Sequence, residues 1–535
     1  MASTTSSVEC DVVVVGGGNA GFCAAISAIQ SGAGNVLLID KCPEEWAGGN
    51  SYFTAGAMRT AHSGLKDVLP LVNNVDTEIA KLIDLEPYTR DDFLADMDRI
   101  THGKYNRELG RTLVEESTSA IQWLAKTGVR FQLSFNRQAY KVDGRYKFWG
   151  GLCLKTEDGG RGLIQDHQNA AARHGITVLY QTAAEKINLD PETGGFKSLL
   201  VDQKGRKVSI IAKALILAAG GFESNPRMRA QYLGPGWDLA HVRGTPYNTG
   251  ECLEMAMRDI AAKQAGQWSG CHSVAWDANS PQNSGDREIS NEFTKSGYPF
   301  GVTINSQGSR FFDEGSDIRN YTYAKFGKAI LAQPQGVAFQ VWDSQTIKWL
   351  RDEEYRDEIV DKIRGDSIED LAKKCAMKGL ENPGGFVTTL KSYNEAVYNH
   401  RAEKGREVKW DPAVKDGLGT QSSKTQLSVP KSNWALPLDK GPFMAIKVGC
   451  GVTFTFGGLA VDSKTSGVIS NLTDKVVPGV FCAGEMLGGL FYENYPGGSG
   501  LTSGAVFGRK AGIRAAAMVK ESSKTSCGRV VSSRL

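Results

Sequence analysis

The sequence lacks the patterns that mark several common kinds of protein. Its ten cysteines include no CxxC pair and no CxxCH haem-attachment motif, so we expect no iron–sulfur or haem site and mostly reduced, buried thiols in an intracellular protein. The seven histidines show no HExxH or comparable pairing, and no metal site is expected. No apolar run approaches the roughly 18 residues of a membrane span, and the first ten residues do not resemble a signal peptide.

Strong charge of either sign is also missing. The chain has 62 Lys and Arg against 59 Asp and Glu, a formal net charge of +3, and no long basic run. Neither nucleic acid nor an anionic membrane surface is therefore an expected partner, and small-molecule chemistry is favoured. The 535 residues are too many for one ordinary core and predict about two to four domain-sized units.

The most informative stretch present is 11–21, DVVVVGGGNAG. Four consecutive valines predict a parallel strand buried on both faces. Gly16 permits a tight turn, Gly18 permits close approach of a pyrophosphate, and Gly21 permits close helix packing. A helix over 20–31 follows, with its N-terminal amides available to phosphates.

A second strand, 35–40, ends in Asp40, about 20 residues beyond the glycines. A carboxylate at that place can accept a hydrogen bond from a ribose hydroxyl. Strand, glycines, helix, strand and acid together predict a dinucleotide with a free 2′-hydroxyl. A chance glycine turn is the alternative reading of the three glycines alone.

Glycine-rich turns and a change in texture organise the rest of the chain. The loops 46–59, 217–222 and 243–250 follow the first motif, and 217–222 ends a predicted buried strand. From Trp268 to about Cys450 the sequence has more aromatic residues and polar loops, which predicts a second domain. His167 is expected on the surface.

The last segment returns to the pattern of the first. An apolar strand over 476–485 ends in Ala-Gly-Glu, a glycine-rich loop covers 488–500, and a helix is predicted over 501–520. The helix therefore begins directly after the loop, so its dipole directs positive charge toward a ring held there. On a flavin, this charge would stabilise the anionic reduced form.

These motifs, in this order, resemble the FAD-dependent fumarate reductase and succinate dehydrogenase flavoprotein superfamily. The strings are DVVVVGGGNAG, GGNS, LAAGGF, NTG, NxxGxRFxxE and VFCAGE. The resemblance implies an α/β, Rossmann-like FAD-binding domain built from both chain ends, with an inserted α+β capping domain and substrate held between them. The implied bounds are 9–267 and 451–522 for the FAD domain, 268–450 for the cap and 523–535 for a C-terminal tail.

The resemblance also implies which residues contact FAD. They lie in the glycine motif, at the end of the second strand, in the small-residue loop, in the two later glycine turns and around the final helix start. The residues are Gly16, Gly18, Asn19, Ala20, Gly21, Asp40, Lys41, Gly49, Asn50, Ser51, Ala219, Gly220, Gly221, Asn248, Thr249, Gly250, Gly484, Glu485, Gly500 and Leu501.

Two substitutions distinguish this chain within the superfamily. Fumarate reductases hold substrate carboxylates with a histidine in an HTMGG-like segment and an arginine in an NRLGG-like segment. Here these segments read FTFGG over 454–458 and NYPGG over 494–498, so both groups are absent. TFTFGG, YPGGSGLTSGAVFGR and GSDIRNYTYAKFG look most like the tricarballylate dehydrogenase-like branch, whereas Tyr495 before Pro and Gly looks like a tyrosine of 3-ketosteroid 1-dehydrogenases.

Both analogies imply dehydrogenation of a C–C bond next to a carboxylate or ketone. Such a reaction needs a base, a contact for the developing enolate and a hydride acceptor, which FAD supplies. By resemblance Arg310 is expected to anchor a carboxylate and secondarily to carry a proton, and Tyr495 to polarise a carbonyl or act as base. Arg59, His272 and Glu314 are weaker candidates for catalytic residues.

Two other functions stay open at this point. One is an FAD-dependent alkene reductase of the fumarate reductase type, and the other is a non-catalytic flavin-binding or electron-relay subunit. The expected partners are a small carboxylic acid or ketone and an unidentified electron acceptor. The final tripeptide Ser533-Arg534-Leu535 resembles a peroxisomal address, so peroxisome and cytoplasm are the two expected locations.

Overall fold

The computed structural model describes residues 6–148, 150–404, 410 and 414–532. Within them the chain forms two compact units. Unit 1 is drawn from 1–233, 244–271 and 454–535, and unit 2 from 234–243 and 272–453. The tripeptide 533–535 lies outside the described residues, so the predicted peroxisomal address has no structural counterpart.

Unit 1 is built on a six-stranded sheet that combines strands from both ends of the chain. The order is β10 (Thr177–Leu179), β3 (Val36–Ile39), β2 (Val12–Val15), β14 (Ala214–Leu217), β24 (Val476–Cys482) and β23 (Gly467–Ile469). All neighbours are parallel except β23 and β24. The valines of β2 are completely or almost completely buried, which agrees with the covered central strand expected from their unbroken apolar run.

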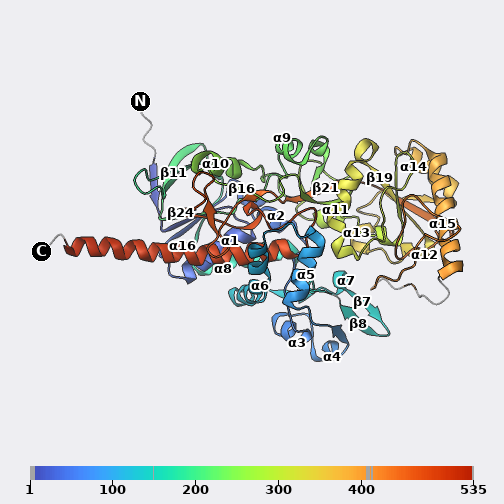
Figure 1. Ribbon diagram of the computed structural model, residues 1–535, viewed down its shortest axis with the longest axis horizontal. Coiled ribbons are helices and arrows are strands. Elements are labelled where there is room, and N and C mark those ends of the chain that lie inside the picture. The colour runs from blue at the N-terminus through green and yellow to red at the C-terminus, as the bar shows by residue number, and fades with distance from the viewer. Residues whose placement is uncertain (1–5, 149, 405–409, 411–413, 533–535) are drawn as a thin grey trace. The chain divides into compact units, whose positions relative to one another are not determined.

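Helices cover this sheet. The helix α1 (Asn19–Gln30) packs along α16 (Ser499–Ser532), and α8 (Gly159–Arg173) also lies against α1 (Figure 1). Small residues at this interface let the backbones approach, since a Cβ on Gly508 would lie 2.4 Å from the carbonyl oxygen of Ala20. The helix α16 extends to Ser532, so residues 523–532 of the expected C-terminal tail are helical.

A second sheet of unit 1 extends the fold beyond the nucleotide-binding half. Its order is β1 (Ser6–Glu9), β13 (Arg206–Ile211), β12 (Phe196–Gln203) and β11 (Thr182–Leu189). The helices α5 (Arg90–Thr101), α6 (Arg107–Thr127) and α10 (Glu251–Ile260) belong to the same unit. No helix of the described residues is both long and apolar enough to cross a bilayer.

Unit 2 has its own sheet and core. The order is β15 (His241–Val242), β21 (Phe443–Thr455), β19 (Ala338–Asp343) and β18 (Val302–Asn305), and β17 (Cys271–Asp277) and β20 (Ile363–Gly365) also pair with β21. Residues 234–243 cluster with this unit because β15 pairs with β21. The helices α14 (Ile368–Ala376) and α15 (Pro383–Lys404) pack against each other beside the sheet (Figure 1).

Candidate functional site

The three glycines after β2 have three different environments. Gly16 has a φ of +106°, and a Cβ there would lie 2.3 Å from the carbonyl oxygen of Ala218. A Cβ on Gly21 would lie 1.8 Å from the carbonyl oxygen of Gly16. A Cβ on Gly18 would meet no described protein atom closer than Ser51 Oγ, at 3.5 Å. Gly16 and Gly21 therefore serve the packing of strand and helix, while the backbone at Gly18 is left approachable by a ligand.

Asp40 lies at the end of β3 beside this turn. Its Oδ2 accepts a hydrogen bond from the Gly17 N–H at 2.7 Å, and its Oδ1 accepts one from the Cys42 N–H at 3.0 Å. Each carboxylate oxygen has a second lone pair, so the group can still accept from a hydroxyl. The carboxylate both stabilises the glycine turn and remains suited to hydrogen bonding with a ribose.

The next predicted group, Lys41, reaches the turn that precedes α10. Its Nζ lies 2.6 Å from Thr249 Oγ1 and forms an ion pair with Glu251. Gly250 begins α10 with a φ of +79°, a conformation that favours glycine. The structure thus brings Lys41 together with Thr249 and Gly250, which the sequence separates by about 200 residues.

The loop containing Gly49 forms the short helix α2 (Gly49–Tyr52) against the start of α1. Ser51 Oγ accepts a hydrogen bond from the Asn19 N–H at 3.0 Å. Asn50 Oδ1 accepts one from the Thr245 N–H at 2.9 Å, so the side chain links this loop to the later glycine turn. These contacts hold two predicted FAD-binding segments in a defined geometry.

Asn19 joins three helices of unit 1. Its Nδ2 donates to the Leu501 carbonyl oxygen at 2.9 Å, and its Oδ1 lies 3.0 Å from Nε2 of His167 on α8. His167 is completely buried and stacks on Phe22, so its predicted surface position is wrong. Burial lowers the pKa of His167 to about 3. The pattern of apolar residues in α8 did not indicate that α1 would cover the face of α8 that carries His167.

The second glycine turn, after β14, meets the segment after β24. Ala219 N–H lies 3.2 Å from Met486 Sδ, and Gly220 has a φ of +76°. A Cβ on Gly221 would lie 2.1 Å from Glu485 Oε1. Gly484, which has a φ of +71°, faces the Cβ of Ala20. Because β2, β14 and β24 are parallel neighbours, their C-terminal ends lie side by side at one edge of the sheet.

An aromatic set surrounds the loop before α16. Phe454, Phe456, Phe491 and Tyr495 make edge-to-face contacts, with ring centroids 5.0 Å apart for Phe454 and Tyr495. Gly500 lies beside this set, since a Cβ there would be 3.8 Å from Phe454. In the segments 454–458 and 494–498 this unit presents aromatic rings and no cationic side chain.

Arg59 is part of the support for that loop. Its side chain is completely buried, Nε donates to the Gly497 carbonyl oxygen at 2.9 Å, and Nη1 donates to Tyr88 Oη at 2.8 Å and Asp96 Oδ2 at 3.2 Å. Its backbone N–H also donates to the Gly498 carbonyl oxygen. These bonds anchor the Tyr495 loop, a positioning role that a buried, hydrogen-bonded guanidinium fulfils well.

The observations on unit 1 fit FAD. The backbone at Gly18 is approachable, α1 and α16 begin next to the two glycine-rich turns, and Asp40 retains acceptor capacity. Helix N-termini and closely approaching backbone suit a pyrophosphate. When bound, FAD would be held by these turns of unit 1.

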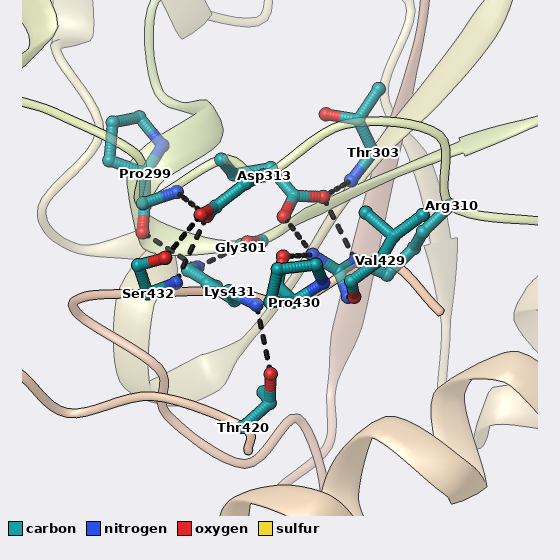
Figure 2. Close-up of polar contacts among 12 residues, drawn as sticks. Pro299, Gly301, Thr303, Arg310, Asp313, Thr420, Val429, Pro430, Lys431 and Ser432 are labelled. Atoms are coloured by element: carbon teal, nitrogen blue, oxygen red, sulfur yellow. Dashed lines mark hydrogen bonds and ion pairs between the residues drawn. The ribbon is translucent and has the colours of Figure 1, made fainter. Parts of the chain in front are cut away.

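Unit 2 contains the other predicted catalytic residues. Arg310 directs four hydrogen bonds within this unit: Nε and Nη2 to Glu314, Nη1 to the Val429 carbonyl oxygen at 2.8 Å, and Nη2 to the Pro430 carbonyl oxygen at 3.1 Å (Figure 2). Glu314 is completely buried and also accepts from the Thr303 N–H at 2.7 Å. Burial opposes ionisation, but the Glu314 carboxylate raises the pKa of Arg310 above its ordinary value.

A buried lysine extends this network. Lys431 Nζ donates to the carbonyl oxygens of Pro299 and Gly301 at 2.8 and 2.6 Å (Figure 2). Burial lowers the pKa of Lys431 to about 8. Sequence reasoning missed this residue, since a lysine in a polar loop gives no sign of burial. Together Arg310 and Lys431 fasten the segment 429–432 to the strand region 299–303.

His272 and Arg319 are two further groups of unit 2. His272, on β17, is almost completely buried with its ring against Tyr323, and burial, followed by the nearby Arg243 charge, lowers the pKa of His272 well below its ordinary value. Arg319 is only partly buried, and its Nη1 donates to Ser296 Oγ at 3.1 Å. Arg319 lies within GSDIRNYTYAKFG, so the sequence held the signal, but it was not among the predicted site residues.

The comparison with known families settles the identity of this arrangement. A family model described as FAD binding domain matches residues 11–501. The chain belongs to this FAD-binding flavoprotein family. The predicted FAD cofactor, the superfamily membership, the α/β fold with a capping unit and the classification as an FAD-dependent oxidoreductase are confirmed.

Individual relatives of this flavoprotein cover nearly its whole length. A probable fumarate reductase from Shewanella frigidimarina is 27% identical over 507 residues, which are 94% of this chain and 74% of that protein. The open conformation of a flavocytochrome c3 fumarate reductase is similar with a TM-score of 0.69 and 25% identity, over 97% of this chain and 79% of that one.

A third similarity concerns the fold alone. A 3-ketosteroid Δ1-dehydrogenase from Sterolibacterium denitrificans is similar with a TM-score of 0.70 and 19% identity, over 95% of this chain and 99% of that one. The same architecture therefore occurs in proteins named for reduction and for dehydrogenation. Direction and substrate must be argued from the residues of this chain.

Proposed function

We propose that this flavoprotein is a dehydrogenase that desaturates a C–C bond α,β to the carbonyl of a small organic molecule. The aromatic set around Tyr495 is the observation that carries the proposal. Four rings stand in and beside the segments where, by family resemblance, fumarate reductases hold carboxylates with histidine and arginine. Such surroundings favour an apolar, ring-bearing ketone over a dicarboxylate, because a charged group there would lose hydration without gaining an ion pair.

Tyr495 is the proposed catalytic residue of unit 1. Its side chain is 7% exposed, and its backbone N–H donates to Asn494 Oδ1 at 2.8 Å. A phenol can donate a hydrogen bond to a carbonyl oxygen and so stabilise the negative charge that develops as the α-proton leaves. FAD, when bound, supplies the hydride acceptor. Arg59 keeps the tyrosine loop in place.

For Arg310 we propose a positioning role in unit 2. Its hydrogen bonds to Glu314 and to two carbonyl oxygens support this role, since an arginine that binds a carboxylate through two parallel N–H groups needs those groups to be available. Arg319, which is partly buried and donates to Ser296 Oγ, is a second cationic candidate for contact with a substrate carbonyl or carboxylate.

A tricarballylate dehydrogenase-like activity is the second candidate. The strings TFTFGG and GSDIRNYTYAKFG favour it, and Arg319 lies within the second string. Tricarballylate carries three carboxylates, so this candidate requires arginine contacts to dominate binding. The two candidates therefore differ in which residue, Tyr495 or Arg319, controls the affinity for substrate.

Anaerobic reduction of the bound flavin separates the candidates. Cyclic ketones and small tricarboxylates are each mixed with the holoenzyme, and loss of the oxidised flavin absorbance is followed. We expect bleaching by a cyclic ketone, and Tyr495→Phe should slow it about a hundredfold because one hydrogen-bond donor to the developing oxyanion is lost. An unchanged rate in Tyr495→Phe would remove the catalytic role of this tyrosine.

Three further measurements test the remaining assignments. Arg319→Lys is compared with Arg310→Lys, because only the former should raise the concentration of substrate needed for half-maximal bleaching. Bleaching by tricarballylate alone, with loss in Arg319→Lys, would support the second candidate instead. Rapid reoxidation of chemically reduced enzyme by an alkene, without bleaching by any saturated compound, would identify a reductase.

A further inference from the structure

Glu223 is a completely buried carboxyl group that the proposed reaction does not use. It follows the glycine turn after β14. Its Oε1 accepts hydrogen bonds from two side-chain amides, Nδ2 of Asn50 and, at 2.6 Å, Nδ2 of Asn248. Its Oε2 receives no hydrogen bond from a conventional donor among the described residues. A buried carboxylate oxygen without a donor is costly, so this oxygen must be satisfied in another way.

The group that faces it is a second carboxyl, Glu485. Burial first, and then the charge of Glu485 and a side-chain contact with it, raise the pKa of Glu223, which indicates that the two carboxyl groups lie close together. Oε1 of Glu485 accepts from the Thr455 N–H at 2.7 Å and from Thr455 Oγ1 at 3.0 Å. Gly221 is needed here, because a Cβ would lie 2.1 Å from that same oxygen. Two ionised carboxylates have no proton with which to make a hydrogen bond to each other.

No cation in the described part of the chain forms an ion pair with either glutamate. Arg229 donates through Nη1 to the main-chain carbonyl oxygen of Glu223. Lys41, on the adjoining turn, pairs with Glu251. Burial, and then the charge of Glu485, raise the pKa of Glu223 well above its ordinary value. A proton shared by the two groups would remove one of the two adjacent negative charges.

We propose that Glu223 and Glu485 share a single proton, carried by Glu223 Oε2 and donated to Glu485, and that this proton joins the segments that bind FAD. Through Asn50, Asn248 and Glu485 the pair connects α2, the turn before α10 and the end of β24 to the turn after β14. Glu223 is thus a positioning residue. The inference depends on FAD binding and is independent of the substrate.

The proposal predicts an alkaline limit to FAD binding. Once the shared proton is lost, two adjacent carboxylates repel each other and the segments separate. FAD affinity should then fall with pH by up to tenfold per unit, the limit for release of one proton. The folded pKa of Glu223 is raised, so its contribution to stability is complete below the unfolded pKa and is lost as pH rises through the folded one.

Glu223→Gln is the decisive variant. The glutamine amide can accept from Asn50 and Asn248 through Oε1 and donate to Glu485 through Nε2, but it has no proton to lose. We expect FAD affinity within about threefold of wild type at pH 6, and no fall over the alkaline range in which the affinity of wild type falls. The dissociation constant is measured by fluorescence titration of apoprotein, and the melting temperature of the apoprotein is followed in parallel.

The apolar variant Glu223→Leu is the control and should lose affinity more than tenfold at every pH. Equal alkaline falls in wild type and Glu223→Gln, or lost affinity of Glu223→Gln at pH 6, would overturn the proposal. Infrared spectra of the wild-type protein give a test that does not depend on a variant folding. The carbonyl stretch of a protonated carboxylic acid at pH 7 should disappear as pH rises, together with FAD affinity, and retention of the band after FAD is released would also overturn the proposal.

Discussion

The two units neutralise a buried glutamate in opposite ways. In unit 2 the completely buried Glu314 receives the Arg310 guanidinium and the Thr303 N–H. In unit 1 the equally buried Glu223 receives two amide donors and faces another carboxyl group. A guanidinium stays charged at all ordinary pH values, whereas a shared proton leaves as pH rises. The stabilisation of Glu314 by Arg310 should therefore be insensitive to pH, whereas the stabilisation of Glu223 by a shared proton should be lost as pH rises.

The largest expected effect comes from Glu314→Gln. This substitution leaves the buried Arg310 charge without its partner, which typically costs about 3–5 kcal/mol of folding free energy. Urea unfolding at pH 7 measures the change. Glu223→Gln is the matched control, because the same chemical change at the other buried glutamate should cost less than about 1 kcal/mol if Glu223 is already uncharged. Equal costs at the two positions would contradict the comparison.

A second test crowds the surroundings of the carboxyl pair in unit 1. In Gly221→Ala the added Cβ would meet Glu485 Oε1 and Thr455 Oγ1, both at 2.1 Å, and overpacking of this kind costs about 1–3 kcal/mol. Gly18→Ala serves as the control, since its Cβ meets no protein atom within 3.4 Å. Thermal unfolding of the apoproteins should show a loss in Gly221→Ala alone, while Gly18→Ala should weaken FAD binding because its Cβ faces the ligand. The larger Gly18→Val should abolish it.

His167 extends the comparison to acid pH. Its pKa of about 3 in the fold lies below the ordinary value of 6.5, so the unfolded chain binds the extra proton between these values. Stability should therefore fall as pH decreases from 6.5, by about 1.4 kcal/mol per pH unit at most. His167→Gln can donate to Asn19 without titrating, so it should lose less stability between pH 6.5 and 5. Parallel unfolding curves for the two proteins at both pH values would show that His167 does not titrate in this range.

The smallest expected effect is that of Glu223→Gln on stability at neutral pH. Below the folded pKa of Glu223 both proteins carry an uncharged group there, so their unfolding free energies should agree within about 1 kcal/mol. Above the folded pKa of Glu223 wild type should become the less stable of the two. Chemical denaturation at a series of pH values from 7 upward measures the unfolding free energies of both proteins. A difference between them that does not change with pH would indicate that this pair does not hold the proton.

Local patterns predicted the nucleotide-binding half of unit 1 well. The valine run forms β2 and the residues after it form α1, and a Cβ would clash with backbone at Gly16 and Gly21 but not at Gly18. These features are predictable because a strand, a tight turn and a helix start depend on neighbouring residues. The family resemblance added FAD and the capping unit. It could not reveal how each side chain within a unit is paired.

Neighbouring residues were enough to predict the strand–glycine–helix unit, a dinucleotide site and the aromatic composition of the segments around Tyr495. The fold was needed to show that His167 lies beneath α1, that Arg310 is bonded to Glu314 and two carbonyl oxygens, and that Glu223 lies close to Glu485. The physical reason is the range of the interactions. A turn or cap is fixed by residues a few positions apart, whereas the partner of a buried charge is fixed by which distant strands end side by side in the sheet.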